Sequence, residues 1–441
     1  MSLAAQASAM LDTIDVAALG PRRVGRLAAF DGQMLEVTGF VQPIGSTARV
    51  IDAHGQPTIA EVVGFRGDRA MLMGFEGDRA HLNGARVEPD GFGGSVAVGD
   101  GLLGRVIDAL GNPLDGRGPI NASARWPLAG RPGNPLHRTR VTRPFDLGVR
   151  AVNALLTAGL GQRIALIAGS GVGKSVLLGQ MIAGAEADVT VIGLVGERSR
   201  EVTDFVETKL AGARRDKSIV VAVPADHPPV LRLRAAMRAT AIAEYYRAQG
   251  LKVLLLIDSL TRVAHAQREI GLSLGEPPTM KGYPPSALAM VPRLVERAGA
   301  DVRTGGAITA VYTVLADGDD LDDPIVDTAR AIVDGHIVLA RSLAEQGVYP
   351  AIDIGRSLSR VMADVADEAH LAAARGFRRL WSVFEENRDL IMMGAYKAGA
   401  DAAIDEAIAR RQDLLAFVGQ GQKERVDLAA ARERLIKEFS R

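Results

Sequence analysis

The chain has 441 residues, of which 47% are hydrophobic and 24% charged, as is ordinary for a globular protein of about two to four domains. Its formal net charge is +0, so the composition offers no general attraction to nucleic acid or to an anionic membrane. The absence of cysteine excludes disulfides, thiolate metal sites and cysteine nucleophiles. Apolar runs stay well short of the ~20 residues that cross a bilayer, and residues 1–12 lack the basic start of a secretory signal. We therefore expect a cytoplasmic protein.

The chain divides into four parts by residue composition and hydrophobic pattern, and we predict each part to be a separate segment or domain. Residues 1–24 are alanine-rich with loosely helical apolar spacing, which fits either a frayed tail or a helix that docks on a partner. Residues 25–95 hold short apolar runs broken by Gly, Asp and Asn, which indicates a small β-barrel. Residues 96–364 alternate β-branched runs with helical patterns, which is typical of an α/β core with a parallel sheet. Residues 365–441 have helical spacing throughout, so we expect a C-terminal helical domain.

Strands and helices alternate through the expected core. Residues 111–135 are rich in Gly and Pro, which indicates connecting loops. The expected buried strands are 163–167, 189–195, 219–223, 253–257, 307–315 and 336–339, and the expected helices are 175–182, 231–249 and 287–297.

The strongest motif, Ala168-Gly-Ser-Gly-Val-Gly-Lys-Ser175, follows an expected strand and opens an expected helix. Glycines let backbone N–H groups cradle phosphates, and a helix N-terminus attracts negative charge. Lys174 would reach the β- and γ-phosphates of ATP, and the Ser175 hydroxyl would bind Mg²⁺. Ala168 stands where the consensus has its first glycine. The residues predicted to bind the nucleotide here are Gly169, Ser170, Gly171, Val172, Gly173, Lys174, Ser175 and Val176.

Two further strand ends carry charged residues. An apolar run over 253–257 ends in Asp258, and a carboxylate at the carboxyl end of a buried parallel strand suits the Mg²⁺ shell. The expected strand over 189–195 leads to Glu197, which could polarise the attacking water. Arg198 and Arg262 could hold γ-phosphate oxygens. On spacing alone, a solvated, charged helix start is the other interpretation of Glu197 and Arg198.

Together these motifs resemble the type III secretion ATPases, above all the flagellar protein-export ATPases. The family is related to the catalytic subunits of rotary ATP synthases. The resemblance implies an N-terminal β-barrel, a RecA-like P-loop ATPase core and a C-terminal helical domain, and it runs from about residue 25 to the C-terminus. It rests on residues 101–116, 168–175, 196–202, 258–262, 282–297 and 386–396.

The resemblance also implies a role for individual residues. Lys174 and Ser175 match the phosphate-loop residues, Glu197 the catalytic glutamate, Asp258 the magnesium-side aspartate, and Arg198 and Arg262 the phosphate-contacting arginines. Tyr349 matches the aromatic residue that stacks on adenine, although a core tyrosine is the alternative. Arg360 matches the arginine finger, which in the synthases comes from a neighbouring non-catalytic subunit.

The presence of both a catalytic glutamate and an arginine finger on one chain predicts a ring of identical subunits. Because Glu197 and Arg360 lie on the same chain, identical subunits can each hydrolyse ATP and supply a finger to a neighbour, which a closed head-to-tail ring allows. By resemblance the ring is a homohexamer in the cytoplasm, peripherally at the cytoplasmic face of the inner membrane. The resemblance implies as partners a peripheral stalk-like regulator, a central stalk-like protein, the export gate, chaperones and export substrates. It implies that the ring engages, releases and unfolds those substrates.

Four alternatives are open at this point. The catalytic motifs are shared with virulence-type secretion ATPases. A rotary synthase subunit is less favoured, since Gly394-Ala-Tyr396 stands where the synthase catalytic chain has its acidic signature. An RNA-translocating hexamer would need a basic barrel, yet residues 25–90 have no lysine and more acids than arginines, so we expect no specific nucleic acid. A non-catalytic nucleotide-binding scaffold would lack Lys174 or Glu197.

Overall fold

The computed structural model describes residues 24–77, 79–90, 94–131, 134–210, 212–316, 318 and 320–440. Apart from Val24, the N-terminal segment predicted over residues 1–24 lies outside the described residues. The chain divides into two compact units, the first ending at Gly93 and the second starting at Gly94. The helices that the structure describes include none with the length and apolar character needed to span a bilayer.

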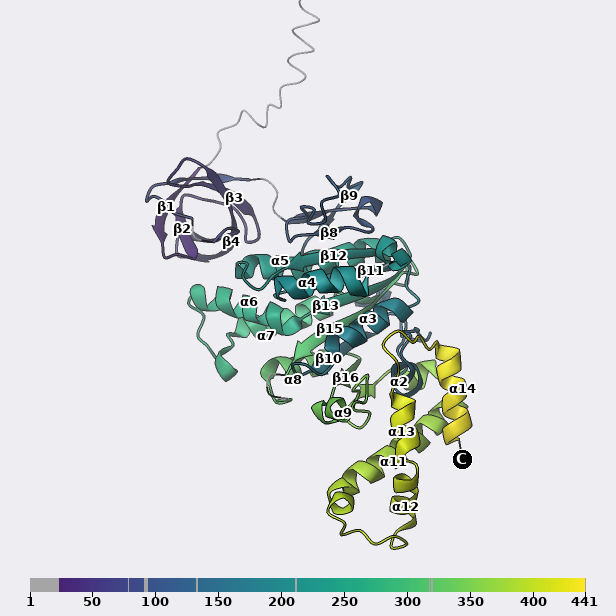
Figure 1. The fold of residues 1–441 in the computed structure, drawn as a ribbon. Coiled ribbons are helices and arrows are strands. Elements are labelled where there is room, and N and C mark those ends of the chain that lie inside the picture. The colour runs from purple at the N-terminus through teal and green to yellow at the C-terminus, as the bar shows by residue number, and fades with distance from the viewer. Residues whose placement is uncertain are drawn as a thin grey trace, which may run out of the picture. The chain divides into compact units, whose positions relative to one another are not determined.

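The first unit is a closed barrel in which the strands follow the order β1–β2–β5–β4–β3–β6 (Figure 1). Burial alternates along β4, because successive side chains of a strand point to opposite faces of the sheet. The inward-facing residues form a core of their own, with Leu35, Val50, Val62 and Leu72 fully or almost fully buried. The predicted β-barrel is therefore confirmed. Its strands are β1 Gly25–Phe30, β2 Met34–Thr38, β3 Thr47–Ile51, β4 Pro57–Arg66, β5 Arg69–Gly74 and β6 Arg86–Pro89.

The second unit is built on a sheet ordered β17–β16–β10–β15–β13–β11–β12–β8, with β14 paired to β15. Neighbouring strands run parallel except at β17 and β14, which are antiparallel to their partners. The central strands are buried on both faces, as their unbroken apolar runs predict. The strands are β8 Val106–Ile107, β10 Arg163–Ala168, β11 Val189–Val195, β12 Ser218–Val223, β13 Lys252–Asp258, β14 Gly299–Ala300, β15 Ala307–Leu315, β16 Gly335–Val338 and β17 Leu358–Ser359.

One part of the prediction was incomplete. Residues 111–135, expected to be loops, contain β9 (Ala124–Pro127), which pairs antiparallel with β7 (Ser95–Val98) in a separate two-stranded ribbon. Trp126 of β9 is buried, and its indole N–H donates to Glu244 Oε2 at 3.1 Å. The buried Trp126 side chain thus ties the ribbon to Glu244. A strand of four residues leaves little periodicity in the sequence, so it is hard to predict.

Helices cover both faces of this sheet. The connection from β10 through α3 to β11 moves along the sheet in one direction, whereas those through α5, through α6 and α7, and through α8 move in the other. Because parallel crossovers are right-handed, α3 and α5–α8 lie on opposite faces (Figure 1). The helices are α2 Arg150–Leu155, α3 Lys174–Gly184, α4 Ser199–Asp204, α5 Pro229–Ala248, α6 Leu260–Ser273, α7 Pro285–Val295, α8 Pro324–Ile332, α9 Arg341–Glu345 and α10 Met362–Val365.

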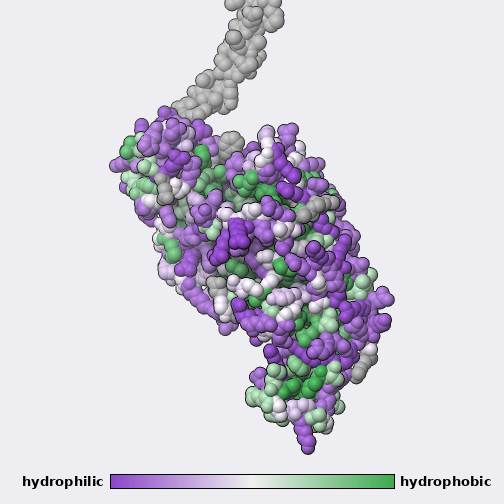
Figure 2. Space-filling view, viewed as in Figure 1, coloured by the Kyte–Doolittle hydropathy of each residue, from purple (hydrophilic) through white to green (hydrophobic). Residues whose placement is uncertain are grey.

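The chain ends in four helices, α11 Glu368–Met392, α12 Ala402–Ala409, α13 Arg411–Val418 and α14 Leu428–Phe439. They pack around a cluster of aromatic rings on three of these helices, Phe377, Trp381, Phe417 and Phe439. Figure 2 shows hydrophobic residues gathered at the lower end of the molecule, in this helical region. At the end of α11, Leu390, Met392 and Met393 are exposed. Exposed apolar side chains grouped in this way are typical of contact surfaces.

Candidate active site

The phosphate loop joins β10 to α3. Gly171 and Gly173 have φ values of 76° and 94°, in the left-handed region that glycine adopts without steric penalty. Gly169 and Val172 are buried and anchor the loop in the core, whereas Ser170 and Gly171 are exposed at its tip. A loop that is anchored at its base and open at its tip can present backbone N–H groups to a phosphate.

Lys174 is the first residue of α3, and its ammonium lies between two carboxylates. Nζ is 3.1 Å from Glu197 Oε1 and 2.5 Å from Asp258 Oδ1. Thr313 of β15 donates from Oγ1 to the same Asp258 oxygen at 2.6 Å. All these side chains are largely buried, so their charges interact with little screening by water.

Parallel pairing explains why the carboxylates meet. β11 pairs directly with β13, and Leu194 stands opposite Asp258 in the register. Asp258 ends β13, while Glu197 follows the end of β11, so both lie at the carboxyl edge of the sheet. Ala168, which stands where the phosphate-loop consensus has its first glycine, is the buried last residue of β10 at that same edge. Open α/β sheets bind ligands at this edge.

The electrostatics favour a charged lysine. Burial alone would lower the pKa of Lys174, but the charges of Asp258 and Glu197 outweigh burial and hold that pKa above its ordinary value. Burial raises the pKa of Asp258, and the neighbouring ammonium opposes this shift. The Lys174 ammonium therefore stays protonated at neutral pH.

Ser175 and Val176 lie in the first turn of α3, Ser175 exposed and Val176 half-buried. Ser175 lines a pocket of 420 Å³ together with Glu197, Arg198 and Asp258. A hydroxyl at a helix N-terminus beside a buried carboxylate is a donor set that fits Mg²⁺. The other residues lining the pocket are Leu194, Arg200, Glu201, Val202, Asp204 and Phe205.

The two arginines predicted to contact phosphate, Arg198 and Arg262, differ in how firmly their side chains are held. The Arg198 side chain is 86% exposed and lies 3.9 Å from Glu201, so it is free to reach into the pocket. Arg262, in the first turn of α6, packs over Gly196: a Cβ there would lie 3.0 Å from Arg262 Cβ. The buried Nε of Arg262 has no hydrogen-bond partner within the described parts of the chain. A donor of this kind, packed against Gly196 next to Glu197, fits an anionic ligand.

Tyr349 lies beside the phosphate loop. A Cβ added to Gly173 would sit 3.4 Å from Cδ1 of the Tyr349 ring. The residue is 44% exposed, so it is not buried in the core. Its carbonyl accepts a hydrogen bond of 2.7 Å from the backbone N–H of Gln420, between α13 and α14.

Arg360 is apart from the other predicted residues. It follows β17, which runs antiparallel to β16, and its backbone N–H donates to the carbonyl of Asp334 just before β16 begins. It therefore lies at the amino edge of the sheet, opposite the phosphate loop. Its side chain is exposed and donates to the carbonyl of Arg330 at 3.3 Å. The structure thus gathers the predicted site residues at one edge, with the exception of Arg360.

Three contacts at the site could not be read from the sequence. Thr313 bonds Asp258, Arg341 donates to the carbonyl of Ser170 at 3.2 Å, and Gln420 bonds Tyr349. A threonine inside a buried β-branched run is the only one of these with a faint signal, since a buried hydroxyl needs a partner.

Two family models and many curated relatives match this chain. Residues 148–359 match the ATP synthase alpha/beta family, nucleotide-binding domain, and residues 366–437 match the C-terminal domain of the type III secretion ATPase EscN. The chain is 50% identical to the flagellum-specific ATP synthase of Pseudomonas aeruginosa over 93% of this chain and 92% of the relative. For the Salmonella typhimurium protein of the same name, the identity is 52% over 92% and 91%. The type 3 secretion system ATPase of Xanthomonas euvesicatoria is 45% identical over 90% of each chain.

Solved structures of a type III secretion ATPase have the same fold as this chain. The assembled ATPase EscN from enteropathogenic E. coli superposes with a TM-score of 0.88 at 41% identity, covering 94% of this chain and 99% of that one. EscN in complex with its central stalk EscO gives a TM-score of 0.84 at 40% identity, with the same coverage. The fold and the resemblance predicted from the sequence are thereby confirmed. The chain belongs to the type III secretion ATPases, within the ATP synthase alpha/beta family and alongside the flagellum-specific ATP synthases.

Proposed function

We propose that this chain hydrolyses Mg-ATP at the site around Lys174 and that the reaction drives or primes flagellar type III protein export. The observation that carries the proposal is the Lys174 ammonium between Glu197 and Asp258, beside a glycine loop at the carboxyl edge of the sheet. An entering phosphate would compete with the two carboxylates for that ammonium. The loop from Gly169 to Gly173 and the first turn of α3 would bind the phosphates, and Tyr349 would contact the adenine.

In the proposed reaction a water attacks the γ-phosphorus in line, and the bond to the bridging oxygen of ADP breaks. Glu197 orients and polarises that water. Lys174, Arg198 and Arg262 stabilise charge on the phosphoryl oxygens. Ser175 and Asp258 would hold Mg²⁺, which neutralises the β- and γ-phosphate oxygens when bound.

Arg360 completes the site only from another copy of the chain. It is exposed at the opposite edge of the sheet from Lys174, so it is available to a neighbour and remote from its own phosphate loop. A closed ring of identical subunits, a homohexamer, would give each site one finger. Arginine fingers are typically worth ~10³–10⁵ in rate.

The relatives favour the flagellar role. Identity is 50–52% to two flagellum-specific ATP synthases and 45% to the Xanthomonas secretion ATPase. The match of residues 366–437 to a secretion-ATPase domain counts against a rotary synthase subunit. We further propose a cytoplasmic ring, peripheral to the inner membrane, that binds a central stalk-like protein and a peripheral stalk-like regulator. The export gate, chaperones and export substrates would be its other partners.

The test is the rate of ATP hydrolysis per subunit against protein concentration, with Lys174→Ala as the blank. A rate that rises steeply as a large species forms is expected, because the isolated subunit lacks a finger. A substantial rate in a monomer, constant across concentration, would contradict the shared site.

A further inference from the structure

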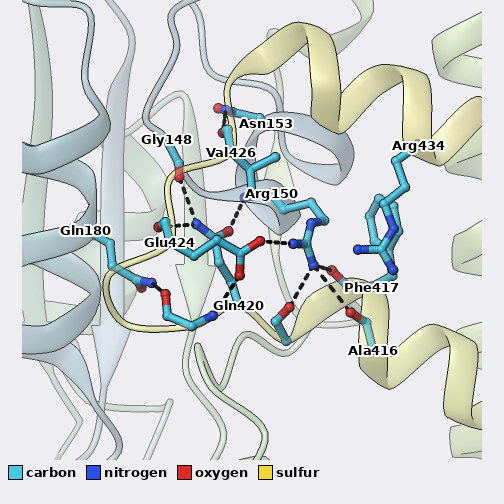
Figure 3. A network of polar contacts seen from close by, with 12 residues as sticks. Gly148, Arg150, Asn153, Gln180, Ala416, Phe417, Gln420, Glu424, Val426 and Arg434 are labelled. Carbon is cyan, nitrogen blue, oxygen red and sulfur yellow. Dashed lines mark hydrogen bonds and ion pairs between the residues drawn. The ribbon is translucent and has the colours of Figure 1, made fainter.

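The loop between α13 and α14, residues 419–427, is fixed to the core by Arg150, the first residue of α2 (Figure 3). The guanidinium is buried and points at the end of α13, whose carbonyls have no partners within the helix. It donates to the carbonyls of Ala416, Phe417 and Gly419, the last at 2.8 Å, and pairs with the carboxylate of Glu424.

Gln420 is the centre of this network. Its Oε1 accepts from the backbone N–H of Arg150 at 2.7 Å, and its Nε2 donates to the carbonyls of Gly148 at 3.0 Å and Glu424 at 2.9 Å. The residue is 6% exposed. An amide that is buried and bonded on both ends has one orientation, so the backbone of Gln420 is fixed as well.

That backbone reaches the nucleotide site. The N–H of Gln420 donates to the carbonyl of Tyr349 at 2.7 Å, and the ring of Tyr349 lies against Gly173 of the phosphate loop. On the other side, Gln180 of α3 donates to the carbonyl of Gly421 at 3.0 Å. The loop is therefore bonded both to Tyr349 and to the helix that carries Lys174.

We propose that Gln420 is a positioning residue for ATP. By holding the Tyr349 carbonyl, it fixes the position of the Tyr349 ring and so shapes the part of the site that binds adenine. This inference rests on the proposed contact between Tyr349 and adenine. Tyr349 is 44% exposed, so packing constrains it only in part, and the hydrogen bond to its carbonyl is a second constraint, which acts on its backbone. The phosphate side depends on other contacts, because Lys174 is held by Glu197 and Asp258.

The experiment measures ATP hydrolysis by the full chain, at a concentration where the wild-type rate per subunit is constant. We expect Gln420→Ala to raise KM for ATP about 5- to 10-fold, toward the lower range of base–aromatic stacking, with kcat within about 2-fold of wild type. The inhibition constant of inorganic tripolyphosphate, which has no base, should not change. In a Tyr349→Ala background, Gln420→Ala should add nothing further.

Asn153→Ala is the matched control. The Asn153 amide also makes three bonds in this network, accepting from the N–H of Leu147 and donating to Asp146 and to the carbonyl of Val426. It fixes the far end of the same loop without touching Gln420 or Tyr349, so KM should stay near wild type. If Gln420→Ala does not fold, Gln420→Glu keeps the acceptor for Arg150 and removes both donors.

Three results would overturn the proposal: an unchanged KM in the Gln420 variants, an equal rise in the tripolyphosphate inhibition constant, or an equal rise of KM in Asn153→Ala. Each of these can occur while the wild-type protein hydrolyses ATP normally. A wild-type protein that hydrolyses no ATP above the Lys174→Ala blank would instead refute the proposed function.

Discussion

The Lys174 ammonium is the charge on which the site depends. It separates two carboxylates, Glu197 and Asp258, that would otherwise repel each other at the edge of the sheet. Their charges hold the lysine pKa above its ordinary value in spite of burial, so the group stays protonated at neutral pH. The same ammonium is available to a phosphate, which would take the place of one or both carboxylates as its partner.

Glu197 should govern the rate of hydrolysis rather than the binding of ATP. Glu197→Gln keeps the shape and an acceptor for Lys174 but loses the charge that polarises water, so kcat should fall about 10²–10⁴-fold while ATP still binds. Steady-state hydrolysis and titration with a fluorescent ATP analogue measure the two effects. The control is Glu207→Gln at an exposed position outside the pocket, which should retain activity. Normal turnover in Glu197→Gln would exclude the glutamate from the chemistry.

At the scale of elements, α3 is held by a close backbone approach at its end. Gly184 packs against the loop before α2: a Cβ there would lie 2.3 Å from Gly148 Cα and 2.7 Å from the Leu147 carbonyl. Gly148 has a φ of 69°, which also favours glycine. The close contact between Gly184 and Gly148 thus fixes the C-terminal end of α3, the helix that begins with Lys174.

Gly184→Ala should therefore lower the free energy of unfolding by about 3 kcal/mol, because the backbone must move to admit a methyl group. Gly179→Ala, on the same helix, is the control. The atoms nearest to its Cβ would belong to the flexible Lys209 side chain, from 3.0 Å, and alanine favours helix by up to ~1 kcal/mol, so it should be neutral or stabilising. Thermal unfolding of both variants measures the difference, and equal effects would contradict the packing argument.

A buried ion pair fixes the chain around β8. Arg105 donates to Asp115 from Nε and Nη2 at 2.8 and 2.9 Å, and the N–H of Val106 donates to the same carboxylate at 3.0 Å. The hydrogen bond from Arg105 holds the pKa of Asp115 well below its ordinary 3.8. A carboxylate with a lowered pKa stabilises the fold above its unfolded pKa, and this stabilisation is lost as pH falls toward the folded pKa.

Asp115→Asn should consequently lower the free energy of unfolding by about 3 kcal/mol near neutral pH, since it leaves the buried Arg105 guanidinium without its charged partner. The difference in melting temperature from wild type should be constant between about pH 5 and 8 and shrink below about pH 4. Asp367→Asn, in an exposed pair with Arg432, should change stability by less than about 1 kcal/mol, because asparagine also caps α11. A difference that grows on acidification would refute the assignment.

The elements that could be predicted are those with strong local patterns. β11 and β15 match their expected bounds, because continuous β-branched runs mark strands buried on both faces. β7, β8, β9, β14 and β17 were missed, since two to four residues carry too little periodicity. At the site, strand ends in a parallel sheet were enough to bring Glu197 and Asp258 to one edge. Gln420 could not be foreseen, since its role depends on how the last helices dock.

At the scale of the whole molecule, the proposed shared active site depends on Arg360. It lies at the amino edge of the sheet, whereas Lys174 lies at the carboxyl edge, so one chain alone does not unite them. If Arg360 acts in trans, Arg360→Ala should leave ATP binding nearly intact and reduce turnover by about 10³-fold or more. Arg356→Ala, at an exposed arginine on the other side of β17, should retain turnover.

The measurement that tests this claim most directly mixes two inactive variants. Lys174→Ala subunits cannot hold the phosphates but still carry Arg360, and Arg360→Ala subunits have the reverse defect. A ring of both contains interfaces where an intact Lys174 faces an intact Arg360, so ATP hydrolysis should reappear in the mixture. If the mixture stays inactive although mixed rings form, the finger does not act between subunits, and the shared active site is contradicted.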